Sequence, residues 1–314
     1  MVGSAAAAEP PVEPDLTRGR VVAVVGPTAT GKSALGIALA HALGGEVVNA
    51  DSMQLYRGMD IGTAKLAEPE RDGVAHHLLD VWDVTQTASV ADYQRMARAR
   101  IAELHARGVT PILVGGSGLY VRAVLDRMEF PGTDDALRAS LEAELVAVGA
   151  PALHARLASA DPGAAAAILP TNGRRIVRAL EVITLTGRPF TAALPAYESM
   201  YDAVQVGLDL SAGDLDARVD ERVRRMFADG LVDEVRGLEK RGLREGRTAS
   251  RALGYQQVLA MLDRTLTEAQ ASAETARATR RFVRRQRSWF GRDPRVRWID
   301  ASADVVDRAM TVLG

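Results

Sequence analysis

The run GPTATGKS at residues 26–33 constrains the fold of this chain most, because it has the spelling G-x-x-x-x-G-K-[ST] of a phosphate-binding loop. Residues 21–25 (VVAVV) form an apolar, largely β-branched run, typical of a strand buried on both faces of a parallel sheet. Residues 33–43 have helical apolar spacing and are followed by Gly44 and Gly45. A strand, a glycine-rich loop and a helix in this order predict a phosphate-binding site.

The residue types of this loop explain how it would hold phosphate. Its glycines let backbone N–H groups curl around phosphate oxygens, and the N-terminus of the following helix adds partial positive charge. Lys32 supplies a mobile positive charge, and the hydroxyl of Ser33 is suited to ligating Mg²⁺. The pattern predicts a di- or triphosphate ligand without identifying it. The candidate diphosphate-binding residues are Gly26, Pro27, Thr28, Ala29, Thr30, Gly31, Lys32 and Ser33.

Further strands and helices alternate after this loop. We expect a short strand at residues 46–48, a helix at 92–107 that begins after Ser89 and ends at Gly108, and a buried strand at 109–114. Such alternation is characteristic of an open α/β sheet. The sequence therefore predicts an α/β fold with a P-loop NTPase-like parallel sheet flanked by helices.

The pattern changes after about residue 125. Residues 134–186 are rich in Ala, Leu, Glu and Arg and have helical spacing throughout. A strand returns at 203–210, a long helix follows at about 215–230, and the rest is mainly helical with a final short strand near 296–299. We expect a disordered extension at residues 1–18, a catalytic core made of 19–126 and 200–314, and an all-helical insertion domain at 127–199.

Composition narrows the class of protein. The 314 residues are 47% hydrophobic, and the formal net charge of −1 argues against nucleic-acid binding by bulk charge alone. The absence of Cys excludes disulfides, Cys-ligated zinc, iron–sulfur clusters and a Cys nucleophile. No apolar run approaches the roughly 20 residues of a membrane span, and the N-terminus lacks the pattern of a signal peptide. We therefore expect a cytoplasmic enzyme that does not bind membranes.

Two polar residues are expected at carboxyl ends of strands, where open α/β sheets bind ligands. Asp51 follows the second strand, and its carboxylate is suited to capping a helix, holding magnesium, acting as a general base or accepting a substrate hydrogen bond. The strand at 109–114 ends in Gly-Gly-Ser without a carboxylate, so the last two roles are at least as good as the magnesium role. Ser117 in this run is either an ordinary turn residue or a hydroxyl that approaches a ligand closely.

Three arginines share one face of the helix expected at 215–230. Arg218, Arg222 and Arg225 are four and three residues apart, so their side chains lie on the same side of the helix. They either face a ligand or pair with Asp216 and Glu221 as a solvated surface.

Arginine is also concentrated in two other places, despite the near-neutral total charge. Residues 277–297 contain nine Arg, no Lys and one acidic residue, interleaved with aromatic residues. Arg174, Arg175 and Arg178 form a second cluster in the helical insertion. Arg makes bidentate phosphate contacts and stacks on bases, so both clusters suit RNA, although each is also compatible with a merely solvated helix.

Seven motifs occur in a fixed order over roughly residues 20–292: GPTATGKS (26–33), NADSMQLYRGMDIGTAK (49–65), HHLLD (76–80), LVGGSGLY (113–120), RRIVRALEV (174–182), ALGYQQ (252–257) and RRQRSWF (284–290). In these motifs the chain resembles bacterial tRNA dimethylallyltransferases, also called tRNA isopentenyltransferases, of the IPP transferase family. The first two motifs together are far more specific than a phosphate-binding loop alone. The family often has Thr where Ser117 stands, which preserves the hydroxyl.

The resemblance implies transfer of the dimethylallyl group from dimethylallyl diphosphate to N6 of adenosine 37, next to the tRNA anticodon. The phosphate-binding loop and a Mg²⁺ ion held at Ser33 would stabilise the departing diphosphate, which carries the developing negative charge. The carboxylate of Asp51 would accept a proton from N6. The implied catalytic residues are Asp51, Ser117, Lys32, Arg222 and Arg218.

The resemblance also implies extensive contacts with RNA. The target base has to leave its stack to reach such a site, so the helical insertion and the C-terminal arginine segment would hold the anticodon stem-loop. Met53 and Gln54, beside Asp51, would contact the target base or its neighbours. The implied tRNA-binding residues are Asp51, Ser52, Met53, Gln54, Ser117, Arg138, Arg174, Arg175, Arg178, Arg284 and Arg285.

Two other functions are compatible with the phosphate-binding loop. A P-loop small-molecule or nucleotide kinase would bind ATP there, and an RNA-binding module would use the loop for regulation. The three differ in what they consume: a kinase releases ADP, the transferase uses dimethylallyl diphosphate, and a binding module does neither. We further expect the protein to be a monomer.

Overall fold

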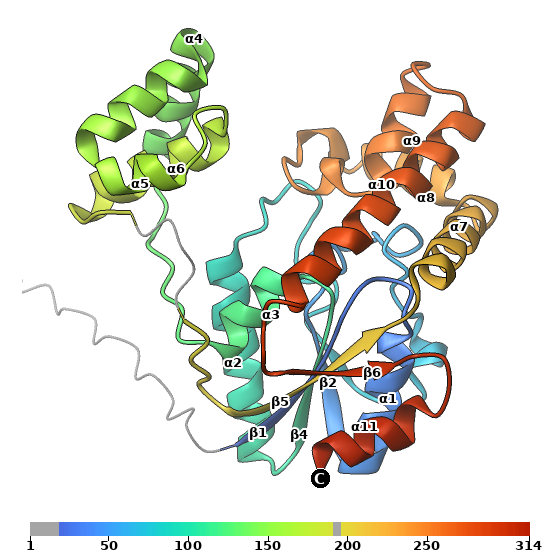
Figure 1. Cartoon of the computed structure of the whole chain (residues 1–314). Helices are drawn as coiled ribbons and strands as arrows, with labels where there is room; N and C mark the ends of the chain where they lie inside the picture. The colour runs from blue at the N-terminus through green and yellow to red at the C-terminus, as the bar shows by residue number, and fades with distance from the viewer. Residues whose placement is uncertain (1–18, 191–195) are drawn as a thin grey trace, which may run out of the picture. The chain divides into compact units, whose positions relative to one another are not determined.

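The computed structural model describes residues 19–190 and 196–314, so the disordered extension expected at residues 1–18 lies outside the described residues. Its strands form one sheet in the order β3-β2-β4-β1-β5-β6, and every neighbouring pair is parallel (Figure 1). The expected α/β fold with a parallel sheet is confirmed. The strands are β1 (Arg20–Val25), β2 (Gly45–Asn49), β3 (His76–His77), β4 (Thr110–Val114), β5 (Asp202–Asp209) and β6 (Val296–Asp300).

The central strand β1 is buried on both faces, as its sequence predicts. Val22 and Val24 belong to a core formed with α1 and α11, whereas Val21, Ala23 and Val25 pack with α2 and α3 on the opposite face (Figure 1). Parallel strands need crossover connections, and these helices cover the two faces of the sheet. Their bounds are α1 (Lys32–Leu43), α2 (Val90–Ala106), α3 (Gly118–Leu125) and α11 (Val305–Leu313).

Two elements go beyond the expected pattern. The strand β3 consists of His76 and His77, which pair with Val47 and Val48 of β2. A two-residue polar strand has no period of its own, so the sequence offers no local signal for it. The strand β6, expected to be the last element, is followed by α11. The other expected strands and helices begin and end within a few residues of their predicted bounds.

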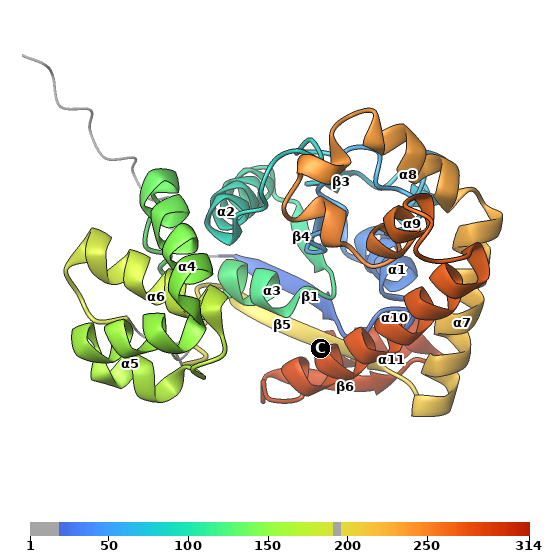
Figure 2. The same cartoon turned by 90° about the horizontal axis from the view of Figure 1, so that it is seen from above.

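A third apolar cluster lies at the carboxyl-end edge of the sheet, where Figures 1 and 2 show α7 to α10 gathered together. Tyr56 and Met59, from the segment after β2, pack there with Leu231 and Val235 of α8 and with Tyr255 of α9. The helices here are α7 (Ala212–Ala228), α8 (Leu231–Glu239), α9 (Tyr255–Leu262), α10 (Glu268–Phe290) and the short 3₁₀ helices η2 (Leu243–Glu245) and η3 (Ala249–Arg251). A further 3₁₀ helix, η1 (Glu68–Arg71), precedes β3.

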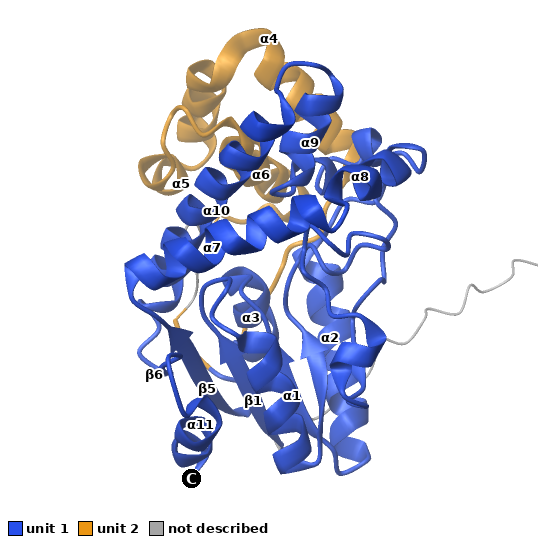
Figure 3. Ribbon diagram, turned by 90° about the vertical axis from the view of Figure 1, so that its right-hand side faces the viewer, with its two compact units in different colours: residues 1–126, 199–314 blue, residues 127–198 orange. Residues whose placement is uncertain are grey.

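Residues Arg127–Glu198 form a second compact unit, separate from the unit made of Met1–Asp126 and Ser199–Gly314 (Figure 3). The sequence predicts this insertion at 127–199, one residue longer at its C-terminal end. Leu153 and Leu157 pack there with Ile176 and Leu180 in a core of the unit's own. Its described helices are α4 (Asp135–Ala160), which is interrupted at Gly149, α5 (Pro162–Ala167) and α6 (Gly173–Thr186). No helix in the described ranges is long and apolar enough to cross a membrane.

Buried ion pairs fix the point at which the chain leaves the larger unit. The carboxylate of Asp126, which is fully buried, accepts hydrogen bonds from Arg122 Nε at 2.6 Å and from Arg295 Nη1 at 2.6 Å. Arg295 also pairs with Asp293 at 2.7 Å. A buried carboxylate is tolerated only when cations and hydrogen bonds compensate it. These contacts therefore hold the end of α3 against the segment that precedes β6.

Candidate active site

The phosphate-binding loop connects the carboxyl end of β1 to the start of α1. Gly26 has a φ of 128°, and a Cβ at this position would lie 2.3 Å from the carbonyl oxygen of Leu208, so the close approach to β5 requires glycine. Thr30 Oγ1 and Lys32 Nζ both donate to the carbonyl of Pro27, at 2.9 and 2.6 Å. The ammonium group is thereby held against the loop in the free protein.

Asp51 lies beyond the carboxyl end of β2, where the buried Asn49 fixes the backbone. Asn49 Nδ2 donates to the carbonyl of Leu78 at 3.0 Å, and Asn49 Oδ1 accepts from the N–H of Asp51 at 2.9 Å. The carboxylate Oδ1 of Asp51 accepts from the N–H of Met53 at 2.9 Å. One carboxylate oxygen of Asp51 therefore stabilises the local turn, and this contact fixes the direction of the second carboxylate oxygen.

Ser117 follows β4 and contacts the Asp51 segment directly. Its Oγ accepts from the backbone N–H of Ser52 at 3.1 Å and lies 3.2 Å from the Ser52 hydroxyl. A Cβ at Gly115 would lie 2.2 Å from the carbonyl oxygen of Ala50, so this glycine lets the two loops approach each other. The hydroxyl and the carboxylate expected at separate strand ends thus belong to one site.

Two of the three arginines on α7 reach this site. Arg222 Nη2 donates to the carbonyl of Thr63 at 3.1 Å, and Arg218 Nη1 lies 3.5 Å from the carbonyl of Ala29 in the phosphate-binding loop. Arg225 instead pairs with Glu221 at 2.9 Å. Arg225 therefore fits the alternative of a solvated arginine face, whereas Arg222 is partly buried against the segment after β2.

The charges of Lys32, Asp51 and Arg222 act on one another. Burial lowers the pKa of Lys32 to about 8; the negative charge of Asp51 opposes this change, and the positive charge of Arg222 adds to it. Burial likewise lowers the pKa of Arg222, again opposed by Asp51. The free site therefore holds two partly desolvated cations with one nearby carboxylate, which favours the binding of an anion.

Glu234 on α8 orders the segment that Arg222 contacts, and the sequence analysis did not identify it. Its carboxylate accepts the backbone N–H groups of Asp60 at 3.0 Å, Ile61 at 2.7 Å and Gly62 at 3.2 Å. The hydroxyl of Tyr255 donates to the same carboxylate at 2.5 Å. Tyr255 belongs to the motif ALGYQQ, whereas Glu234 belongs to none of the seven motifs. The backbone N–H groups that Glu234 binds lie more than 170 residues away, so no local pattern marks it.

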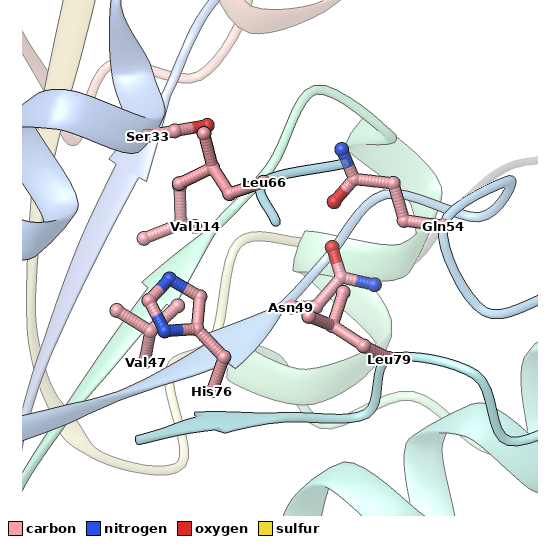
Figure 4. Close-up of a pocket in the computed structure, with 8 residues that line it drawn as sticks. All are labelled: Ser33, Val47, Asn49, Gln54, Leu66, His76, Leu79 and Val114. Carbon is pink, nitrogen blue, oxygen red and sulfur yellow. The ribbon is translucent and has the colours of Figure 1, made fainter. Parts of the chain in front are cut away.

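The two residues after Ser52 are held by the protein itself. Gln54 Nε2 donates to the carbonyls of Thr63 and Ala64 at 3.2 and 3.4 Å, and Met53 packs against the apolar cluster at this edge of the sheet. A small cavity of about 30 Å³ lies beside the phosphate-binding loop, with the Ser33 hydroxyl at its wall (Figure 4). Its lining residues are Ser33, Val47, Asn49, Gln54, Leu66, His76, Leu79 and Val114.

Known proteins resemble this chain in sequence along most of its length. A family model described as IPP transferase matches residues 54–293. The tRNA dimethylallyltransferase of Salinispora arenicola is 70% identical over 90% of this chain and 83% of that protein. The one of Streptomyces coelicolor is 69% identical over 92% of each chain. This chain belongs to the IPP transferase family.

Solved structures agree with this assignment. The tRNA isopentenylpyrophosphate transferase of Bacillus halodurans is 42% identical, with a TM-score of 0.70 over 94% of each chain. A eukaryotic dimethylallyltransferase solved acting on tRNA has a TM-score of 0.81 over 93% of this chain and 78% of that chain; at 24% identity it supports the fold alone. As an IPP transferase, the chain is a tRNA dimethylallyltransferase, and the kinase alternative is set aside.

The arginines of the C-terminal segment of this IPP transferase differ in how closely they are paired with carboxylates. Arg287 pairs with Asp209 at 2.7 Å, Arg280 pairs with Asp220, and Arg277 pairs with Glu274. Arg284 and Arg285 are exposed and more loosely held: Arg284 forms a long ion pair with Asp216 at 3.9 Å, and Arg285 lies 5.7 Å from the ring centre of Phe282. The two arginines that the sequence analysis assigned to tRNA binding are thus accessible on α10.

The arginines of the insertion also differ from one another. Arg138 and Arg178 both pair with the buried carboxylate of Glu181, and Arg178 also donates to the carbonyl of Pro131 at 2.7 Å. Arg174 and Arg175 are exposed. The first two arginines therefore stabilise the insertion itself, a role that the spacing of the cluster does not indicate.

The contacts of Glu234 generate a test of how this family member holds residues 60–62. In Glu234→Gln one carboxylate oxygen becomes an NH₂ group, which cannot accept hydrogen bonds. We expect amide hydrogen exchange at Ile61 and its neighbours to accelerate by about tenfold, because hydrogen bonds to a charged group are lost. The variant Glu239→Gln is the control, since it alters another carboxylate of α8 that pairs with Arg244. Unchanged exchange in Glu234→Gln would contradict the assignment.

Proposed function

We propose that this protein transfers the dimethylallyl group from dimethylallyl diphosphate to N6 of adenosine 37 in tRNA, acting as a cytoplasmic monomer. The observation that carries the proposal is the electrostatic coupling of Lys32, Asp51 and Arg222 at the carboxyl-end edge of the sheet. Two cations and one carboxylate suit a reaction in which an anion departs and an amine loses a proton. The names of the bacterial relatives support tRNA as the acceptor.

The donor is held by residues 26–33 in this proposal. The allylic C1–O bond breaks with carbocation character, and the diphosphate leaves with the bonding electrons. Lys32 and Arg222 stabilise this negative charge, and Arg218, which reaches the loop backbone, adds to it. Ser117 donates to the departing oxygen by turning its hydroxyl away from Ser52, which lies 3.2 Å away.

The acceptor adenine meets the donor beside Asp51. The lone pair of N6 is delocalised into the ring, so the amine becomes a good nucleophile only as it loses a proton. Asp51 accepts this proton while the bond between C1 and N6 forms, which yields N6-dimethylallyladenosine and diphosphate. Because the side chains of Met53 and Gln54 are already held by the protein, they offer a fixed surface to the target base or its neighbours.

Mg²⁺ fits the residues around Ser33. This ion keeps several waters and takes few protein ligands when it binds together with phosphate. The Ser33 hydroxyl lies at the wall of the small cavity beside the phosphate-binding loop, and one hydroxyl ligand is enough where phosphate and waters supply the rest (Figure 4). When bound, Mg²⁺ would neutralise part of the diphosphate charge, and Ser33 would hold it.

RNA binding is assigned to exposed arginines in this proposal. Arg284 and Arg285 on α10, and Arg174 and Arg175 on the insertion, are accessible to phosphate groups. Arg138 and Arg178 remain candidates, but their phosphate contacts would compete with the carboxylate of Glu181. With a net charge of −1, attraction to RNA depends on such local groups rather than on the whole molecule.

The first test concerns Asp51. With unmodified tRNA and dimethylallyl diphosphate, we expect mass spectrometry of tRNA nucleosides to detect the new nucleoside, and Asp51→Asn to slow single-turnover formation by about 10²–10⁴-fold. The amide oxygen of Asn still accepts the N–H of Met53, so the turn and the tRNA affinity should survive. The exposed Asp83→Asn serves as the control. Lost tRNA binding with an unchanged single-turnover rate would make Asp51 a binding residue instead.

The second test uses the pKa of Lys32, which is about 8 in the free protein. Bound diphosphate favours the protonated ammonium, so affinity for dimethylallyl diphosphate is full below pH 8 and falls as the pH rises above it. Binding at pH 9 should therefore take up a proton, measured by calorimetry in buffers of different ionisation enthalpy. In Lys32→Arg the side chain stays charged and this uptake should vanish. Equal proton uptake in both proteins would contradict the role of Lys32.

The third test measures tRNA affinity across a salt series. Each phosphate contact contributes a slope of roughly 0.7–0.9 in log affinity against log salt. We expect the double variant Arg284→Ala/Arg285→Ala to flatten the slope by about one to two units if both residues contact phosphate. The matched control is Arg277→Ala/Arg280→Ala on the same helix, whose guanidinium groups are paired with carboxylates. Parallel lines for wild type and Arg284→Ala/Arg285→Ala would refute the contact.

A further inference from the structure

Gln286 is a buried side chain on α10 that touches two loops of the active site. It belongs to the motif RRQRSWF, whose arginines drew attention to RNA, yet only 5% of the glutamine is exposed. Its Oε1 accepts from the backbone N–H of Thr28 at 2.9 Å, and its Nε2 donates to the carbonyl of Gly116 at 2.9 Å. One amide group thus joins the phosphate-binding loop to the loop that carries Ser117.

The first of these bonds fixes the peptide group between Pro27 and Thr28. The carbonyl of this peptide accepts Lys32 Nζ at 2.6 Å and Thr30 Oγ1 at 2.9 Å, while its N–H donates to Gln286. A peptide group is planar, and its N–H and C=O point in opposite directions. Holding both ends prevents the peptide from rotating, so Gln286 determines where the resting Lys32 finds its acceptor.

The second bond fixes the peptide group between Gly116 and Ser117 in the same way. Its carbonyl accepts from Gln286, and its N–H donates to the carbonyl of Ala50 at 3.3 Å. The hydroxyl of Ser117 starts from this peptide and reaches Ser52. The orientation of Ser117 therefore depends on Gln286 from one side and on the segment after β2 from the other.

The glycines of this loop are required by the inner face of α10. A Cβ at Gly116 would lie 2.3 Å from Gln286 Nε2, and a Cβ at Gly118 would lie 2.1 Å from the ring of Trp289. Gln286 and Trp289 are three residues apart, so they lie on one face of the helix. The run GGSG and the motif RRQRSWF, about 170 residues apart, are thus complementary in shape.

We propose that Gln286 is a positioning residue of the transferase. It sets the separation and the orientation of the two peptide groups that place Lys32 and Ser117, and it acts through them without touching either substrate. This role rests on the proposed function, in which residues 26–33 hold the diphosphate and Ser117 serves the leaving oxygen. A buried glutamine that only satisfies polar groups would matter for stability and not for turnover.

Gln286→Met removes both hydrogen bonds while keeping a side chain of similar length. We expect affinity for dimethylallyl diphosphate, measured by calorimetry without tRNA, to fall about tenfold, and kcat to fall at least tenfold, since each loop loses one fixed contact. The KM for tRNA should stay within about twofold. The matched control is Gln205→Met: Gln205 is also buried, at 2% exposure, and its amide donates to Asp293 at 3.3 Å. It should lose thermal stability but keep both donor affinity and kcat.

The pH dependence of kcat in Gln286→Glu distinguishes a positioning role from a purely structural one. A protonated carboxyl group can replace both bonds of the amide, donating to the carbonyl of Gly116 and accepting from the N–H of Thr28, whereas the ionised form only accepts and repels the carbonyl of Gly116. The ratio of its kcat to that of wild type should therefore approach one at low pH and fall at least tenfold as the pH rises from 5 to 8. The corresponding ratio for Gln286→Met should be independent of pH.

The outcomes separate this role from the proposed donor site. If Lys32→Ala loses donor affinity while Gln286→Met and Gln286→Glu behave like wild type, or like Gln205→Met, the donor site stands and the positioning role is overturned. If Lys32→Ala keeps full affinity for dimethylallyl diphosphate, the donor site is wrong and the positioning role falls with it. A pH-dependent ratio for Gln286→Glu together with weak binding by Lys32→Ala supports both.

Discussion

The parallel arrangement of all six described strands is the constraint on which the active site depends. It brings every carboxyl end to one edge of the sheet, so the segments after β1, β2 and β4 meet although they are far apart in sequence. The order β2-β4-β1 puts the loop after β4 between the other two. Ser117 can therefore contact Ser52 on one side while the neighbouring Gly116 is joined through Gln286 to Thr28 on the other. The site is a direct consequence of strand order.

Helices at this edge complete what the strands begin. Arg218 and Arg222 reach the site from α7, Glu234 orders residues 60–62 from α8, and Gln286 joins two loops from α10. Each of these helices therefore contributes at least one polar side chain to the site. A polar group buried in this way is costly unless it is paired, so the partners on the loops and the helices stabilise one another.

Local features were predictable from the sequence, whereas long-range partners were not. Buried strands such as β1 and the loop 26–33 depend on neighbouring residues, and spacing correctly put Arg218 and Arg222 on one face. The spacing did not predict that Arg225 forms an ion pair with Glu221 instead of reaching the site. The short β3 exists only because β2 lies beside it. The arginines of the motif RRQRSWF indicated RNA binding, but nothing in the motif marks Gln286 as its buried residue. The hydrogen-bond partners of Gln286 lie 258 and 170 residues away.

The electrostatics of the site explain why hydrogen bonds have to hold the phosphate-binding loop in place. Lys32 and Arg222 lie in a partly desolvated region where like charges repel, and Asp51 offsets them incompletely, as the lowered pKa of Lys32 indicates. Left to itself, such a loop would relax by moving the lysine toward solvent. The carbonyl of Pro27 opposes this movement because it accepts the ammonium, and Gln286 keeps that carbonyl in place. Positive charge is thereby held ready before an anion arrives, and stabilising the anion then requires little rearrangement of the protein.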